Sequence, residues 1–180
     1  GGVIDGILSN VDYFYSLGVR MICINWNFFN GIGYPNFKLT EKPDFTNPNT
    51  VDGLTKFGID VVKRMEKLGM IIDVSHLSDK GFWFVYNNAT KPFIASHSNS
   101  REVCNHVRNL TDEMIIAIAK RKGVIGLNFC SSFLSVESDE SLTAIAIYKK
   151  LRSINNLEDK QIYDLKELNN KLNQNSLKIK

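Results

Sequence analysis

Apolar residues follow two alternating patterns along the chain. In four segments they recur every three or four positions, the spacing of a helix with one buried face, at residues 5–17, 54–68, 78–87 and 111–122. Each segment precedes a short continuous apolar run, typical of a buried strand, at residues 20–25, 71–75, 93–96 and 124–128. This alternation predicts an α/β fold in which parallel strands are joined by helical crossovers.

The remaining segments define the predicted organisation of the chain. Residues 26–52 are rich in Asn, Gly and Pro, which predicts a long loop of the kind that is often functional. From residue 141 the chain is rich in Asn, Lys and Leu, and its spacing predicts an amphipathic helix over about 141–175 with no strand after it. We therefore expect a body at 1–140 and a divergent helical tail at 141–180.

The number of helix–strand units limits the architecture. Four parallel strands that each feed a loop on one edge form either an open sheet or part of a (β/α)₈ barrel. A complete barrel needs about 250 residues, whereas this chain has 180. The apolar pattern leaves both architectures open, and a barrel would be only half complete.

Charge and cysteine content narrow the function classes. Residues 146–180 hold eight Lys/Arg and four Asp/Glu, and the other residues hold fourteen and fifteen, so the net charge of +3 comes from the tail. A nearly neutral body argues against nucleic-acid binding as the main function. No apolar run approaches the ~20 residues of a membrane span, so no membrane association is expected. Three cysteines without C-x-x-C spacing fit reduced thiols in a cytoplasmic protein.

Two apolar runs each end in Ser-His, at His76 and His97. The carboxyl ends of parallel strands are where α/β proteins build their sites, and imidazole is the commonest metal ligand, so we expect the two histidines to share a metal ion. A catalytic zinc needs three protein ligands. Asp73 lies within the strand on the face opposite His76, which favours a supporting role over ligation. The alternative is that both histidines are ordinary core or solvated residues.

Other candidates come from the loops at the same predicted edge. Arg108 follows His97 in a polar loop and is a candidate for binding a substrate carboxylate, with a plain surface arginine as the alternative. Trp26 ends the first strand, beside Asn25 and Asn27, and either lines a pocket or packs. His106 is interpreted as a loop histidine. No G-x-S-x-G, Walker A or G-x-G-x-x-G motif is present, which argues against a serine hydrolase or a nucleotide-binding loop.

Several separate motifs resemble the renal (membrane) dipeptidase family of zinc metallopeptidases, and in particular its bacterial branch. Asp73–Ser78, Ala95–Ser100 and Arg108–Asp112 carry the resemblance most clearly. Leu17–Met21, Asn25–Asn27 and Gly123–Phe129 extend it, so that it covers about residues 1–135 in the family's order.

The resemblance implies part of a (β/α)₈ barrel that holds two zinc ions and hydrolyses dipeptides. It implies that His76 and His97 bind one zinc and that Arg108 contacts the substrate. Trp26 falls where some members place a substrate-contacting histidine. The family's first-strand His-x-Asp ligands and bridging glutamate would lie before Gly1, and its late aspartate has no counterpart.

With these groups missing, we expect a truncated and inactive dipeptidase fragment of about four βα units with a helical tail. The alternative is a non-enzymatic remnant that acts through self-association, as a homo-oligomer, or by binding a partner. Exposed strand edges of a half barrel favour such association.

Overall fold

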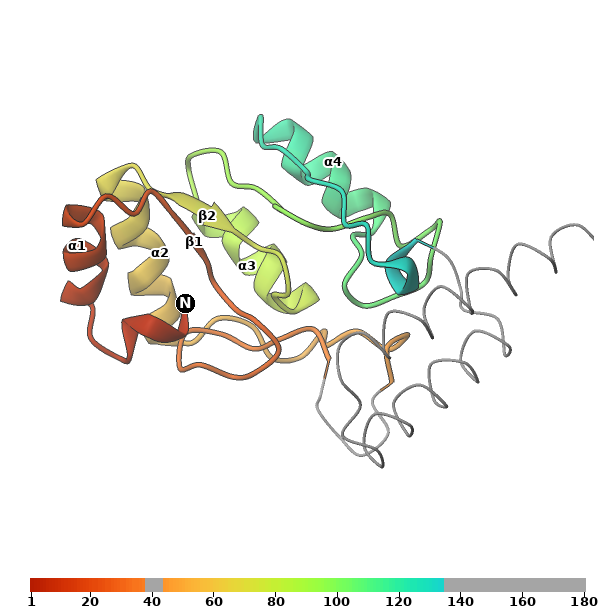
Figure 1. Cartoon of the computed structure of the whole chain (residues 1–180), viewed down its shortest axis with the longest axis horizontal. Coiled ribbons are helices and arrows are strands. Elements are labelled where there is room, and N and C mark those ends of the chain that lie inside the picture. Colours follow the sequence, from red (N-terminus) through yellow and green to blue (C-terminus); the bar gives the residue numbers. More distant parts are fainter. Residues whose placement is uncertain (38–43, 135–180) are drawn as a thin grey trace, which may run out of the picture. The chain divides into compact units, whose positions relative to one another are not determined.

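The computed structural model describes residues 1–37 and 44–134, and it shows a mixed α/β fold as expected (Figure 1). The elements of this part are η1 (Gly2–Ile4), α1 (Ser9–Ser16), β1 (Met21–Cys23), α2 (Lys56–Leu68), β2 (Ile71–Asp73), α3 (Asp79–Asn88), α4 (Asp112–Lys120) and η2 (Ser131–Phe133). The chain divides into two units, Gly1–Val136 and Glu137–Lys180. The expected tail helix at 141–175 lies outside the described residues.

The strands pair in parallel, in the order of the chain. β1 pairs with β2 in the register Met21↔Ile71, Ile22↔Ile72 and Cys23↔Asp73. Two further parallel bridges, Asp73↔Ile94 and Ala95↔Ile125, add the third and fourth predicted strands to the same sheet. Adjacent parallel strands in chain order are what helical crossovers produce.

The third and fourth predicted strands are shorter than the sequence indicates. The runs at 93–96 and 124–128 contribute single bridges rather than continuous strands. One cause is that the backbone N–H of Ser96 donates to the Asp73 carboxylate at 3.0 Å instead of to a neighbouring strand. A side chain thus ends the ladder at the sheet edge where the histidines lie.

All four predicted helices are present, and three of them begin at a side-chain cap. The side chains of Thr55, Ser78 and Thr111 each accept a backbone N–H from the first turn of α2, α3 and α4, respectively. The first helix was expected from residue 5, but α1 begins at Ser9. Asp5 and Gly6 have φ values of 50° and 70°, which are incompatible with a right-handed helix.

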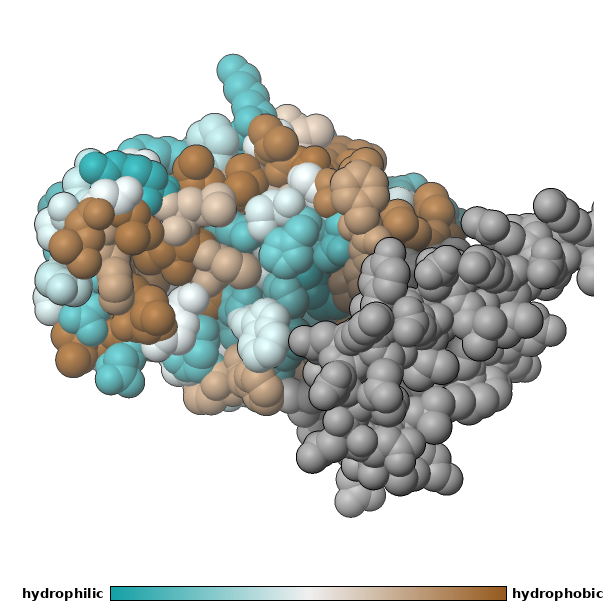
Figure 2. All heavy atoms as spheres, viewed as in Figure 1, coloured by the Kyte–Doolittle hydropathy of each residue, from teal (hydrophilic) through white to brown (hydrophobic). Residues whose placement is uncertain are grey.

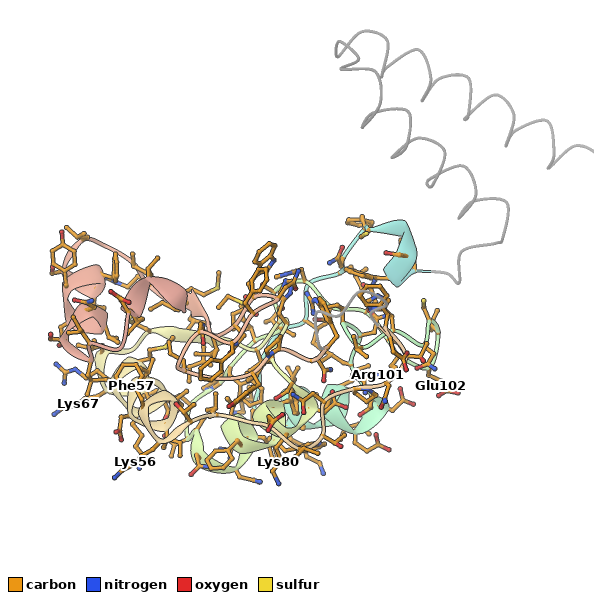
Figure 3. The ribbon with its side chains drawn as sticks, turned by 90° about the horizontal axis from the view of Figure 1, so that it is seen from below. Lys56, Phe57, Lys67, Lys80, Arg101 and Glu102 are labelled. Carbon is orange, nitrogen blue, oxygen red and sulfur yellow. The ribbon has the colours of Figure 1, made fainter. Side chains whose placement is uncertain are left out.

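The helices pack on the sheet through one apolar core, and in Figure 1 they succeed one another along it in chain order. The core unites strand residues with the inner faces of α2, α3 and α4, including Ile22, Ile72, Phe93, Val61, Met65, Phe82, Val85, Met114 and Ile118. Lysines on α2 and α3 point outward (Figure 3). Among the described residues, no helix has the length and apolar character needed to cross a bilayer.

Candidate metal and carboxylate site

The structure brings the two predicted histidines together at the carboxyl end of the sheet. Their Nε2 atoms are 2.8 Å apart. His76 follows β2 with a φ of 73°, a left-handed conformation that few residues other than glycine adopt. The backbone therefore turns sharply at His76, at the point where its ring lies next to that of His97. The expected convergence is therefore confirmed, while the metal-binding role of the pair remains a prediction.

The second ring nitrogen of each histidine has a polar partner. His76 Nδ1 lies 2.9 Å from Asn27 Oδ1, an oxygen that only accepts, so His76 carries its proton on Nδ1. Ser96 Oγ donates to Asp73 Oδ2 at 2.5 Å and is therefore free to accept from His97 Nδ1, which lies 2.7 Å away. With both ring protons on Nδ1, the two Nε2 lone pairs face each other, a repulsive arrangement that a cation between them would relieve.

Asp73 holds the backbone and the Ser96 hydroxyl next to the two histidines. Its carboxylate accepts the backbone N–H groups of Ser75 and Ser96, each at 3.0 Å, as well as the Ser96 hydroxyl. Burial acts to raise the pKa of Asp73, but the hydrogen bonds from Ser96 and Ser75 outweigh it and hold this pKa below its usual value. The buried Asp73 thus stays ionised and supports His97 through Ser96, as its strand position suggested.

The histidine pair suits a divalent cation. Burial, with smaller contributions from Arg108 and His97, lowers the pKa of His76 to about 3. Burial and Arg108 also lower the pKa of His97, so both rings are neutral near pH 7. Two imidazole nitrogens on one tetrahedral zinc lie about 3.3 Å apart, given bonds of ~2.0–2.1 Å. Only a small widening of the pair is needed.

The described residues supply only part of a metal site. Within residues 1–37 and 44–134, no three or more His, Cys, Asp or Glu side chains gather where they could hold one ion. Asp73 is turned toward Ser96 rather than toward the facing Nε2 atoms. The pair therefore fits two ligands of a zinc ion and leaves its other positions to water or to groups outside these residues.

A cavity of about 510 Å³ lies over the pair. It is lined by His76, His97, Cys23, Asn25, Trp26, Phe28, Asn30, Gly1 and Gly2. Trp26 and Phe28 are more than half exposed, and their ring centroids are 5.4 Å apart. Trp26 is thus a wall residue of the cavity, where the sequence placed a substrate contact, and its role in binding remains a prediction.

Arg108 lies beside the pair but does not line the large cavity. Its Nη2 donates to the carbonyl of His97 at 3.4 Å, and it borders a small cavity of about 10 Å³ together with His76. It is only 5% exposed, so it is not a surface arginine, and burial lowers its pKa to about 10. Arg108 therefore lies at the expected edge of the sheet, but the cavity it shares with the histidine pair is the small one, beside His76.

Three contacts of the site were not foreseen from the sequence. Asn27 was expected only to line a pocket, and Ser96 only to precede a histidine, yet each holds the Nδ1 atom of one ring. The repeated Ser-His pair was the available signal for Ser96. His106, interpreted as a plain loop residue, accepts the backbone N–H of Arg108 at 3.0 Å.

Replacing Ser96 with alanine is expected to weaken zinc binding by roughly tenfold, because partners that orient a ligating histidine typically contribute 10–100-fold. The variant removes the oxygen that fixes the protonated Nδ1 of His97. Isothermal titration with Zn²⁺ measures the change. Ser132→Ala, at a hydroxyl that contacts Cys130 Sγ, is the matched control, and an unchanged affinity in Ser96→Ala would contradict the orienting role.

Comparison with known proteins finds a family and several relatives that this chain resembles. The model of the family described as "Membrane dipeptidase (Peptidase family M19)" matches residues 1–170. A Klebsiella pneumoniae protein, described as an uncharacterized protein in the pqqA 5′ region, is 42% identical over 149 residues, covering 80% of this chain and 53% of its own. Mouse dipeptidase 3 is 32% identical over 144 residues, covering 77% and 28%, respectively.

Solved structures show the same likeness. A metallo peptidase from Rhodobacter sphaeroides, liganded with a phosphinate mimic of the dipeptide L-Ala-D-Ala, is 34% identical with a TM-score of 0.65. That match covers 72% of this chain and 36% of the other. The probable dipeptidase PvdM from Pseudomonas aeruginosa is 28% identical with a TM-score of 0.63, covering 86% and 38%. The chain thus spans about half of the Klebsiella relative and little more than a third of these structures.

Proposed function

Because the chain belongs to the membrane dipeptidase family, peptidase family M19, we propose that it is the central part of a zinc-dependent dipeptidase built on a (β/α)₈ barrel. In this proposal His76 and His97 are ligands of one zinc ion of a two-zinc site, and Arg108 binds the substrate carboxylate. The observation that carries it is the facing Nε2 pair, in which both Nδ1 atoms are already engaged.

The chemistry divides between the metal and the residues of this chain. When bound, zinc polarises the peptide carbonyl and lowers the pKa of a water molecule to about 7. His76 and His97 hold the ion, and Asn27 and Ser96 fix their tautomers. Arg108, a buried cation whose Nη2 contacts the His97 carbonyl, would present parallel donors to the carboxylate of a dipeptide once it turns toward the large cavity. Trp26 lines the cavity beside the pair.

Two histidines do not complete such a site. We propose that the 180-residue chain binds zinc weakly and does not hydrolyse dipeptides by itself, since its described residues gather no third ligand. Turnover then requires carboxylates from outside these residues.

A zinc titration tests the proposal. The chain is expected to bind Zn²⁺ in a calorimetric titration, and His76→Ala or His97→Ala is expected to abolish binding because each removes half of the donor pair. Cys130→Ser, which removes an exposed thiol outside the cavity, serves as the control for adventitious zinc. Binding that survives both histidine variants would disprove the site, and zinc-dependent release of alanine from L-Ala-D-Ala would disprove the proposed inactivity.

Exposed apolar residues favour a second candidate, a non-enzymatic role in self-association. Near the edge of the sheet beyond Ala95, Val124 and Leu127 are each 66% exposed and Phe129 is 84% exposed. Figure 2 shows apolar residues gathered in several places on one face. Sedimentation velocity with Leu127→Ser and Phe129→Ser separates the candidates. If the wild-type chain associates but binds no zinc, and these variants lose the association, the result would favour a role in self-association.

A further inference from the structure

Among the described residues, no ion pair fixes where the buried guanidinium of Arg108 points. Among residues 1–37 and 44–134, its side chain forms no salt bridge and donates only the 3.4 Å hydrogen bond to His97 O. Its guanidinium also lies over the Phe133 ring, 5.8 Å from the centroid. With so few polar contacts, the direction of this side chain depends on the packing around it and on the position of the backbone that carries it.

His106 contacts that backbone directly. Its Nδ1 accepts the N–H of Arg108 at 3.0 Å, while its own carbonyl accepts the N–H of Asn109 at 2.8 Å. The ring is held on two sides, since it stacks on Phe45 at 5.2 Å with a 12° interplanar angle and lies 4.5 Å from the Phe133 ring. A clamped ring thus presents one lone pair to the residue that carries the guanidinium.

We propose that His106 is a positioning residue for Arg108: its Nδ1 lone pair holds the Arg108 backbone so that the guanidinium points where a substrate carboxylate binds. The inference rests on the proposed function, in which Arg108 binds that carboxylate. It assigns to His106 a role distinct from both metal binding and loop packing.

Two features of the surroundings support this role. Burial, then the charges of Arg108 and Arg101, lowers the pKa of His106 to about 4, so the ring is neutral near pH 7 and keeps its lone pair. Arg101 donates from Nη2 and Nε to the carbonyl of Asn109, at 2.7 and 3.0 Å. The backbone is thereby anchored after Arg108, and His106 supplies the anchor on Arg108 itself.

A matched pair of variants separates positioning from packing. His106→Asn keeps an acceptor oxygen near the place of Nδ1 but loses the aromatic ring, whereas His106→Phe keeps the ring and loses the acceptor. His106→Leu is a second acceptor-free variant in case the phenylalanine variant does not fold. The ¹⁵N-labelled chain is examined by amide hydrogen exchange at Arg108 and by NMR titration with L-Ala-D-Ala.

The positioning role predicts that His106→Phe, which lacks the acceptor, loses more than His106→Asn. His106→Phe is expected to lose roughly tenfold in Arg108 amide protection and in dipeptide affinity, the size of one net hydrogen bond, while His106→Asn stays within about threefold of wild type. A packing role predicts the reverse order. Wild-type values in His106→Phe, or equal losses in both variants, would overturn the inference.

The two proposals fail in different ways. A wild-type chain that takes up no dipeptide contradicts the proposed function, not the contact. The amide of Arg108 then decides: protection lost in His106→Phe and kept in His106→Asn supports the positioning of Arg108, and equal protection overturns it. Zinc binding at His76 and His97 is expected to be unchanged in both variants.

Discussion

Replacing Arg101 with alanine is expected to destabilise the chain by about 3–5 kcal/mol, the usual cost of leaving one member of a buried ion pair without its partner. Arg101 donates to both carboxylate oxygens of Asp79, at 2.7 and 2.8 Å, and the two side chains are each only 12% exposed. The same guanidinium also holds the carbonyl of Asn109. Urea unfolding followed by circular dichroism gives the free energy of unfolding.

Two comparisons make the Arg101 result specific. Glu102→Ala changes the neighbouring charge, which is exposed and lies at the outer edge of the described part in Figure 3, and should change stability by less than about 0.5 kcal/mol. The double variant Asp79→Leu with Arg101→Met removes both charges and should lose less than Arg101→Ala. If the free energy of unfolding of Arg101→Ala stays within about 1 kcal/mol of wild type, the buried Asp79–Arg101 pair does not need both partners.

Local sequence patterns predicted the elements but not the long-range contacts that hold them. Helical spacing located α1 to α4 because burial of one face repeats every 3.6 residues. The Asp79–Arg101 pair joins α3 to a loop 22 residues later. Nothing in the spacing of one segment indicates which distant side chain will meet it, so this pair was not foreseen.

The same limit applies within the site. The two Ser-His endings predicted where His76 and His97 would lie, because parallel strands bring their carboxyl ends to one edge. Their Nδ1 partners were not predictable in the same way. Asn27 comes from a loop 49 residues before His76, and the link from Ser96 to Asp73 crosses between neighbouring strand positions. Which nitrogen of each ring stays free depends on these contacts.

For Arg108, the residue type and its place in the sequence predicted a role, but the sequence did not predict its surroundings. Its place after the second histidine suggested a carboxylate-binding group near the same edge. The sequence did not reveal that it would be buried next to a small cavity or that His106 would hold its backbone. The small cavity is lined by residues from distant segments, among them His76, Phe82 and Met114, and no periodic pattern encodes how these meet.

Asp73→Asn is expected to weaken zinc binding by about 10–100-fold even though the residue is not a ligand. Wild-type Ser96 donates to Asp73 Oδ2 and so accepts from His97 Nδ1. An amide Nδ2 in place of Oδ2 would donate to Ser96, whose hydroxyl proton then turns to His97 Nδ1 and moves the ring proton to Nε2. Zinc titration of the variant measures the loss, and unchanged affinity would contradict this reversal.

Asp73→Asn should also remove an acid-dependent part of the stability. The folded-state pKa of Asp73 lies below its unfolded value of about 3.9, so its ionised form stabilises the fold above that pH, and the contribution disappears as pH falls through the folded pKa. Near pH 6 the wild type should therefore be more stable than the variant by roughly 1–3 kcal/mol. The gap should shrink as the pH falls below about 4. Urea unfolding at several pH values tests this, and a gap that widens toward acid would mean that the hydrogen bonds from Ser75 and Ser96 do not stabilise the carboxylate.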